Sequence, residues 1–254
     1  MLAASNEWAW VPDGAPHVQN EEYLVVAYPD WFVTPTSARV FGSERDAVEL
    51  ADEICAVARE WGRDRLWWRL SEFTRPAALE HELESRGATV AERMDVLALP
   101  VADGVPDLAV PGDVDVRQVT DEQTVRDSLE VVHDAFGGHE PTDEQVATSL
   151  AEVEAGLTDG SGGRWVAYAD GRPASTGGYT LAEDVCRLWG GGTHRSLRSR
   201  GAYRAVLGAR LAAARAAGAT LALTHGVVDT SSPILGRLGF TRHGEERTLA
   251  LDLT

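Results

Sequence analysis

Apolar residues early in the chain recur at intervals of three and four, which is the spacing of one face of a helix. This pattern predicts a helix over residues 43–62, with Ser43 as its N-terminal cap and Gly62 at its end. The apolar face of this helix would be formed by Ala47, Leu50, Ala51, Ile54, Val57, Ala58 and Trp61.

The rest of the chain alternates between helical periodicity and short apolar runs. Asp170 and Gly171 form a turn signal between two such runs, which predicts a β-hairpin. The predicted strands are 65–70, 90–99, 114–119, 164–169, 174–181, 185–190, 220–224 and the residues up to 253, and the predicted helices are 76–87, 121–136, 143–157, 201–217 and 232–237.

Two halves of the chain have a similar order of elements. Residues 101–113 collect glycine, proline and aspartate, so we expect domains at 1–105 and 113–254 with a linker between them. Residues 85–99 align without gaps on residues 237–251, and each half runs helix, glycine, strand, short helix, glycine, strands. We interpret this as an internal duplication, although so short a match also arises by chance.

Composition excludes several classes of protein. The 254 residues, 44% of them hydrophobic and 25% charged, are typical of a soluble globular protein, and the first residues show neither a basic leader nor a long apolar run, so we expect a cytoplasmic location. Cys55 and Cys186 stand apart from any CxxC or Cys/His cluster, so neither a disulfide framework nor a metal site is expected. The net charge of −17 argues against nucleic-acid and membrane partners.

The distribution of the basic residues is more informative than the total charge. The chain contains no lysine, and no acidic residue lies between Asp184 and Asp229. That stretch holds Arg187, Arg195, Arg198, Arg200, Arg204, Arg210 and Arg215. A local cationic segment in so acidic a chain indicates an anion site.

The segment at 190–206 has the features of a diphosphate site. A predicted strand enters a loop of glycine and arginine that opens directly onto a helix, and the first backbone N–H groups of a helix have no intrahelical partners. Gly201 would allow close approach to phosphate oxygens, while Arg198, Arg200 and Arg204 would add charged hydrogen bonds. The alternative is a solvated, arginine-rich helix start.

This segment resembles the acetyl-CoA-binding motif of the GNAT superfamily of N-acetyltransferases, Q/R-x-x-G-x-G/A, as Arg198-x-x-Gly201-x-Tyr203. The strand before it, the helix after it and the ending LGRLGF at 235–240 follow the family's order. The motif departs at Tyr203, where the family prefers glycine or alanine.

The resemblance implies an α+β fold with a mixed, twisted sheet flanked by helices, and a truncated GNAT-like half before it. It implies acetyl-CoA as acyl donor and no metal. The implied cofactor-binding residues are Gly192, Thr193, Arg198, Ser199, Arg200, Gly201, Ala202, Tyr203 and Arg204. In the first half the matching segment is 38–46, where Glu44 and Asp46 would repel a diphosphate, so we expect that half to be a degenerate, non-binding copy.

The family's chemistry is direct attack of an amine on the thioester. The tyrosine that often serves as acid in the family is replaced here by Leu235. Alternation places Glu183, Arg187 and Trp189 on one face of the strand before the loop, which the resemblance directs toward the acceptor. Glu183 is then a candidate base, and Arg187 and Trp189 are candidate substrate contacts, although each could be an ordinary surface residue.

The family also places the loop at 131–141 over the acceptor, which makes His139 a candidate contact and Glu140 a second candidate base. The sequence thus predicts an acetyl-CoA-dependent N-acetyltransferase acting on a small amine. It leaves open a non-catalytic acyl-CoA sensor or scaffold and a plain interaction module. It also leaves open the acceptor's identity and a homodimer.

Overall fold

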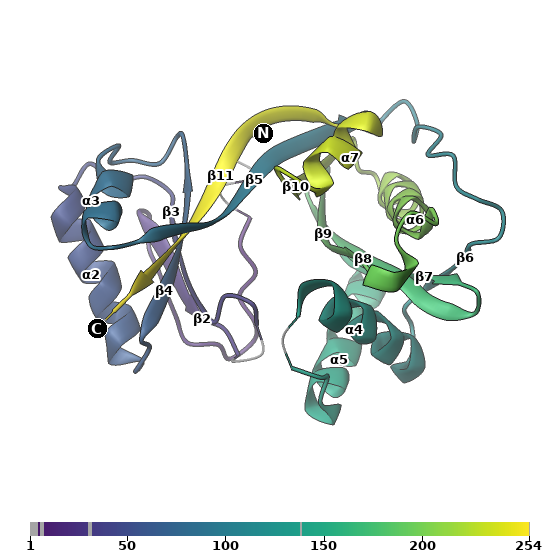
Figure 1. The fold of residues 1–254 in the computed structure, drawn as a ribbon, viewed down its shortest axis with the longest axis horizontal. Helices are drawn as coiled ribbons and strands as arrows, with labels where there is room; N and C mark the ends of the chain where they lie inside the picture. Colours follow the sequence, from purple (N-terminus) through teal and green to yellow (C-terminus); the bar gives the residue numbers. More distant parts are fainter. Residues whose placement is uncertain (1–4, 6–7, 30–31, 138, 254) are drawn as a thin grey trace. The chain divides into compact units, whose positions relative to one another are not determined.

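The computed structural model describes residues 5, 8–29, 32–137 and 139–253, which form two compact units (Figure 1). Unit 1 comprises Met1–Leu97, Gly226–Leu235 and Arg242–Thr254, and unit 2 comprises Ala98–His225 and Gly236–Thr241. The compact units therefore do not coincide with the ranges 1–105 and 113–254 expected from the linker, because the end of the chain belongs mostly with the first half.

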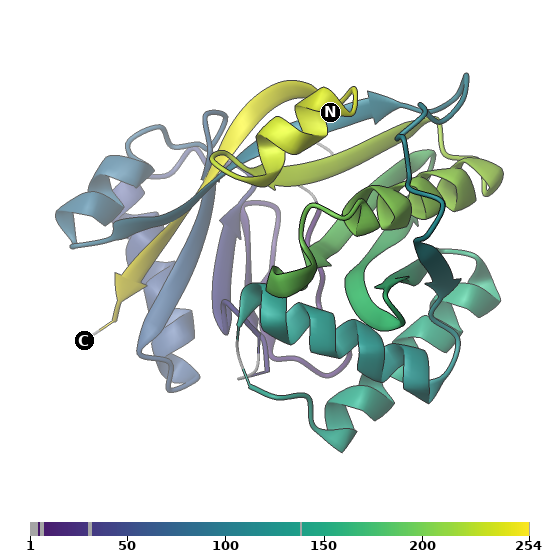
Figure 2. The same ribbon diagram turned by 45° about the vertical axis from the view of Figure 1, so that its right-hand side comes forward.

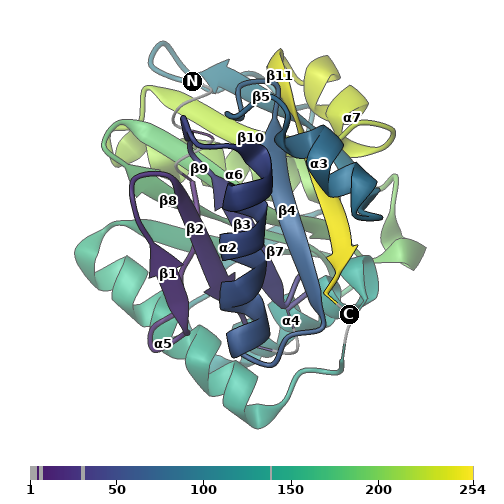
Figure 3. The same ribbon diagram turned by 90° about the vertical axis from the view of Figure 1, so that its left-hand side faces the viewer.

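Unit 1 has parallel and antiparallel strand pairs, and α2 and α3 pack against one face of these strands. Its strands follow the order β1-β2-β3-β4-β11, with β3 and β4 parallel and the other pairs antiparallel. Figure 3 shows α2 lying across β2, β3 and β4. The elements are β1 (His17–Gln19), β2 (Tyr23–Ala27), β3 (Thr36–Val40), α2 (Ala47–Glu60), β4 (Arg65–Ser71), α3 (Leu79–Ser85), β5 (Thr89–Pro100), α7 (Ser231–Arg237) and β11 (Thr241–Asp252), of which β5, α7 and β11 run past the division between the units.

The core of unit 1 lies between α2, α3 and the sheet. Five of the seven residues predicted to form the apolar face of the first helix are buried there, including Leu50 and Ile54, in one cluster with Trp68 and Leu249 of the strands. The other two, Val57 and Trp61, are partly buried against the same cluster. The prediction that Ser43 caps this helix is wrong. Asp46 is the cap and accepts a hydrogen bond from the Val48 N–H at 2.8 Å, because the helix begins at Ala47, the first residue of the apolar pattern.

In unit 2 the strands pair in the order β10-β9-β8-β7-β6, and α6 and α4 contact them (Figure 2, α6 in light green and α4 in teal). β9 and β10 are parallel and the other pairs are antiparallel. The elements are β6 (Asp115–Gln118), α4 (Glu122–Phe136), α5 (Asp143–Asp159), β7 (Gly162–Ala169), β8 (Arg172–Ala182), β9 (Val185–Thr193), the 3₁₀ turn η1 (Arg195–Leu197), α6 (Ala202–Ala216) and β10 (Leu221–Val227).

Helices cover both faces of the unit 2 sheet. Neighbouring residues of a strand point to opposite faces, and Thr176 contacts α4 through Ser128 whereas Gly177 lies against Arg210 of α6. Val166 and Tyr168 pack with α4 and α5 on the first of these faces. The predicted hairpin around Asp170 is confirmed as β7–β8.

The two halves of the chain repeat one pattern. β3–α2–β4 and β9–α6–β10 each consist of two parallel strands joined by a helix, and each is followed by a short helix and a long strand. The fold class and the predicted order of elements are confirmed. The strands ending each half, β5 and β11, are each one continuous strand.

The described residues include neither a membrane-spanning helix nor a cluster of metal-ligating side chains. No helix in this part of the chain is long and apolar enough to cross a membrane. Within the same residues, no group of three histidine, cysteine, aspartate or glutamate side chains could hold a metal ion.

Candidate functional site

The first residue of interest is Gly201, where α6 begins. Gly201 has a left-handed backbone (φ 81°), and no side chain caps the helix. In contrast, α2, α4 and α5 are capped by Asp46, Asp121 and Thr142. The N–H groups of the first turn of α6 are thus left for another acceptor, and that turn contains no acidic residue.

Three residues of the predicted cofactor loop line a hollow at this helix start. Ser199, Arg200 and Arg204 line one open hollow of about 330 Å³, together with Asp113 and Asp170. Arg200 forms an ion pair with Asp170, which lies in the β7–β8 turn. The pair holds Arg200 beside the hollow and offsets part of its charge, whereas Arg204 adds a second guanidinium to the same wall.

Two features fix the backbone of this loop. Ser199 is one of few non-glycine residues with a positive φ (65°), and Arg198 before it is extended and exposed. A Cβ atom at Gly201 would lie 2.4 Å from Cδ of Pro111, so the segment preceding β6 packs directly on the glycine. Position 201 therefore requires glycine both for its conformation and for space.

Tyr203 is directed toward β9. Its ring carbon Cε2 would lie 3.2 Å from a Cβ at Gly191, and the Arg210 guanidinium is one of the groups that influence the pKa of its hydroxyl. Burial raises the pKa of this phenol, and the neighbouring guanidinium opposes the rise. This contact gives the large side chain a place against the strand, where the family motif has glycine or alanine.

The end of β9 is irregular where it approaches the loop. Thr176 pairs with Gly192 and Gly178 with Trp189, so Gly190 and Gly191 together face the single residue between Thr176 and Gly178. This is a β-bulge, and Gly190 has a φ of +61°. In the described residues the pairing of β9 with β10 ends at Leu188 and Thr224, so the bulge lies beyond the parallel ladder.

Gly192 and Thr193 lie at the last turn of α4. A Cβ at Gly192 would meet Phe136 at 2.9 Å, and the Gly192 carbonyl accepts a hydrogen bond from the Ser175 hydroxyl at 2.6 Å. The Ser175 and Thr193 hydroxyls are 3.2 Å apart. The α4 side of Gly192 is thus occupied by protein.

Asp134 of α4 anchors the loop from the other side. Its carboxylate accepts a hydrogen bond from the Arg195 N–H at 2.5 Å and lies 3.5 Å from Nε2 of His194. Nδ1 of His194 is 3.0 Å from the Ser196 hydroxyl. These contacts connect the helix before the predicted acceptor loop with the predicted cofactor loop.

The predicted substrate contacts on β9 share one face, as expected. Arg187 is paired opposite Thr180, and Trp189 donates its indole N–H to the Thr180 hydroxyl at 2.9 Å. The Arg164 guanidinium lies 5.1 Å from the centre of the Trp189 ring, and burial lowers the pKa of Arg164. Trp189 covers Gly178, where a Cβ would be 2.3 Å from the ring.

Glu183 is not where the alternation argument placed it. It lies in the turn between β8 and β9, exposed and with a φ of +56°, and β9 begins only at Val185. At about 3.3 Å per residue, the strand from Val185 to Thr193 spans roughly 26 Å, and Glu183 is at the end remote from the loop. The geometric basis for Glu183 as a base is therefore lost.

The remaining candidates lie in the connection after α4 and in α7. His139 and Glu140 are exposed in the connection between α4 and α5, as predicted, and their roles stay predictions. Leu235, at the position of the family's tyrosine, is buried in α7.

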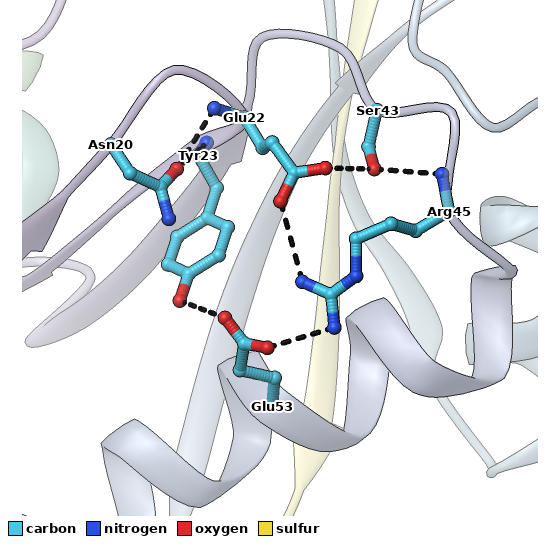
Figure 4. A network of polar contacts seen from close by, with 6 residues as sticks. All are labelled: Asn20, Glu22, Tyr23, Ser43, Arg45 and Glu53. Carbon is cyan, nitrogen blue, oxygen red and sulfur yellow. Dashed lines mark hydrogen bonds and ion pairs between the residues drawn. The ribbon is translucent and has the colours of Figure 1, made fainter.

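In unit 1 the corresponding helix start is filled by the chain's own side chains (Figure 4). The Arg45 guanidinium contacts Glu22 at 3.3 Å and Glu53 at 2.8 Å, and the Ser43 hydroxyl donates to Glu22. Asp46 takes the Val48 N–H of the first turn. Three carboxylates at this helix start disfavour a diphosphate, which supports the prediction of a non-binding copy.

Sequence reasoning missed one residue of this region, Arg210. It was noted only as one basic residue among seven, although its position on the buried stripe with Val206, Leu207, Leu211 and Ala214 was visible in the helical spacing. Arg210 is 2% exposed.

The sequence matches no family model and no curated protein. Solved structures do resemble the chain. A GCN5-related N-acetyltransferase from Kribbella flavida is 21% identical, with a TM-score of 0.65 over 94% of this chain and 90% of that one. One from Sphaerobacter thermophilus is 16% identical, with a TM-score of 0.67 over 92% and 81%.

A tandem GNAT protein from the clavulanic acid biosynthesis pathway is 15% identical, with a TM-score of 0.63 over 100% of this chain and 88% of that one. At these identities the likeness shows the fold. The chain has the fold of GNAT acetyltransferases, in a tandem arrangement.

Proposed function

We propose that this protein is an N-acetyltransferase that transfers an acetyl group from acetyl-CoA to a small amine. The observation that carries the proposal is the start of α6, which has no capping side chain and no acid in its first turn and is flanked by Arg198, Arg200 and Arg204. The fold and its tandem arrangement support the same function.

The residues at this helix start suit a diphosphate. The N–H groups of Ala202 and Tyr203 lie at the positive end of the α6 dipole, Arg200 and Arg204 line the hollow beside them, and Arg198 is exposed three residues before Gly201. Asp170 already compensates Arg200, so Arg198 and Arg204 would supply most of the charge. Acetyl-CoA would bring an activated thioester whose thiolate is a good leaving group, with an ordinary thiol pKa near ~8.5.

The acceptor amine requires more from the protein than the leaving group does. A primary amine with a pKa near ~10 is mostly protonated at neutral pH and must lose a proton before it attacks. Glu140, in the exposed connection after α4, is the candidate base, with His139 beside it. Arg187 and Trp189 would contact the acceptor from β9.

Ligand-dependent stabilisation tests the binding step. A hundredfold excess of acetyl-CoA over its Kd should stabilise the native protein by about 2.7 kcal/mol, seen as a higher thermal midpoint. Arg198→Glu should remove most of this shift. Arg215→Glu, the same charge change at the far end of α6, should retain it. No shift in the wild-type protein, or equal loss in both variants, would contradict the proposed site.

A non-catalytic acyl-CoA-binding protein is the second candidate, which the buried Leu235 in place of the family's tyrosine allows. The two candidates differ in turnover. Incubation with acetyl-CoA and a library of amines should release CoA only when an acceptor is present, with an acetylated product detectable by mass spectrometry. Tight binding without release for any amine would favour the sensor.

A further inference from the structure

A buried guanidinium lies beneath the bulge of β9. Arg210, on the third turn of α6, is 2% exposed, and burial is the main cause that lowers its pKa. Two backbone carbonyls accept its hydrogen bonds, and the Tyr203 hydroxyl and the Cys186 thiol are the side-chain groups that influence its pKa. Among the described residues, none of these groups is a carboxylate. Its Nε has no hydrogen-bond partner.

The guanidinium is bonded to the strands on both sides of the bulge. Nη1 of Arg210 donates to the carbonyl of Gly178 on β8 and to the carbonyl of Trp189 on β9, each at 3.2 Å. Gly178 and Trp189 are the pair at which the regular ladder ends before Gly190 and Gly191. Arg210 therefore hydrogen-bonds both residues of the last regular pair of the ladder, Gly178 and Trp189, from the α6 face of the sheet.

Two glycines make room for this side chain. A Cβ at Gly177, opposite the bulge, would lie 2.7 Å from Nη1 and 2.8 Å from Cζ of Arg210. A Cβ at Gly191 would lie 3.5 Å from Nη2 and 3.2 Å from the Tyr203 ring. The bulge thus packs on the guanidinium of Arg210 and on the ring of Tyr203.

Packing alone does not account for an arginine here. Removing a guanidinium from water costs several kcal/mol in protein interiors, and an apolar side chain such as methionine would fill similar space without that cost. The Arg210 guanidinium therefore points to a role for its hydrogen bonds to the Gly178 and Trp189 carbonyls.

We propose that Arg210 is a positioning residue that holds the Gly190–Gly191 bulge in the shape that receives the thioester end of acyl-CoA. The inference rests on the proposed function. A ligand whose diphosphate lies at the α6 start and whose extended arm follows the unpaired edge of β9 reaches this bulge. There the peptide groups of Gly190 and Gly191 stand outside the regular ladder and can hydrogen-bond that arm.

Two variants disturb the guanidinium from opposite sides. Arg210→Met removes its hydrogen bonds, and Gly177→Ala keeps the charge but places a methyl group where the guanidinium lies. Gly208→Ala, on the same helix as Arg210, is the control. A Cβ at Gly208 would meet only Leu108, at an ordinary van der Waals distance of 3.5 Å. Each protein is titrated with acetyl-CoA and with adenosine 3′-phosphate 5′-diphosphate, the part of CoA that lacks the arm and the thioester.

Arg210→Met and Gly177→Ala should both weaken acetyl-CoA binding at least about tenfold while changing the affinity for the nucleotide fragment less than about twofold. Gly208→Ala should change neither. Equal loss of both ligands would assign Arg210 a merely structural role and overturn the proposal, as would wild-type affinity for acetyl-CoA in both variants. Failure of the wild-type protein to bind acetyl-CoA would instead overturn the proposed function, and this inference with it.

Discussion

Replacing Gly201 by alanine tests the geometry of the α6 start. The residue has a φ of 81°, and a left-handed conformation costs a non-glycine residue about 1–2 kcal/mol. The new Cβ would also lie 2.4 Å from Pro111, an overlap that typically costs a further ~1–3 kcal/mol. The expected loss of unfolding free energy is therefore about 2–5 kcal/mol.

Gly218→Ala, just beyond the other end of the same helix, isolates the first cost. Gly218 has a φ of +100°, but a Cβ there would meet nothing within 4 Å. Urea unfolding should show a loss of about 1–2 kcal/mol for this control. Adding Pro111→Ala to the Gly201→Ala variant should restore only part of the unfolding free energy. That part is the difference between the losses in Gly201→Ala and Gly218→Ala. Equal losses in the two single variants would show that Pro111 does not pack on Gly201, and the described loop would be wrong.

Other predictions concern residues outside this helix start. Glu183→Gln should change kcat/KM with an identified acceptor less than about twofold, because Glu183 lies in the turn remote from the loop; a large loss would show that its position has been misjudged. Burial raises the pKa of Cys55 and raises that of Cys186 to about 12, so a disulfide reagent at pH 8 should label neither thiol before unfolding, and rapid native labelling would contradict their burial. Asp46→Ala should lower the free energy of unfolding by about 1 kcal/mol, because it removes the cap of α2, whereas Ser43→Ala removes no cap and should cost less. A larger loss for Ser43→Ala than for Asp46→Ala in urea unfolding would show that Ser43 is the cap.

The sequence predicted the regular elements well because their signals are local. The stripe of α2, the Asp170–Gly171 turn and the glycine before α6 each depend on neighbouring residues and on backbone preferences. The repeat was visible for the same reason, since both halves contain the same order of local signals.

The errors and omissions have a common cause, which is pairing between distant segments. β11 completes the sheet of the first half, and no local pattern reveals which strand it joins. Alternation was extended to Glu183 because the residue count does not show where the hairpin turns. Arg210 was overlooked because its partners, the Gly178 and Trp189 carbonyls, become neighbours only when β8, β9 and α6 pack together.

The central claim is that the chain binds acetyl-CoA at one of its two corresponding helix starts. Calorimetric titration of acetyl-CoA into the wild-type protein, Arg198→Met and Arg45→Met tests it directly, since the same substitution is made at each start. We predict one site per chain, at least about tenfold weaker binding in Arg198→Met and unchanged binding in Arg45→Met, whose guanidinium is already held by Glu22 and Glu53. Two sites per chain, no binding, or a loss caused by Arg45→Met rather than Arg198→Met would contradict the account.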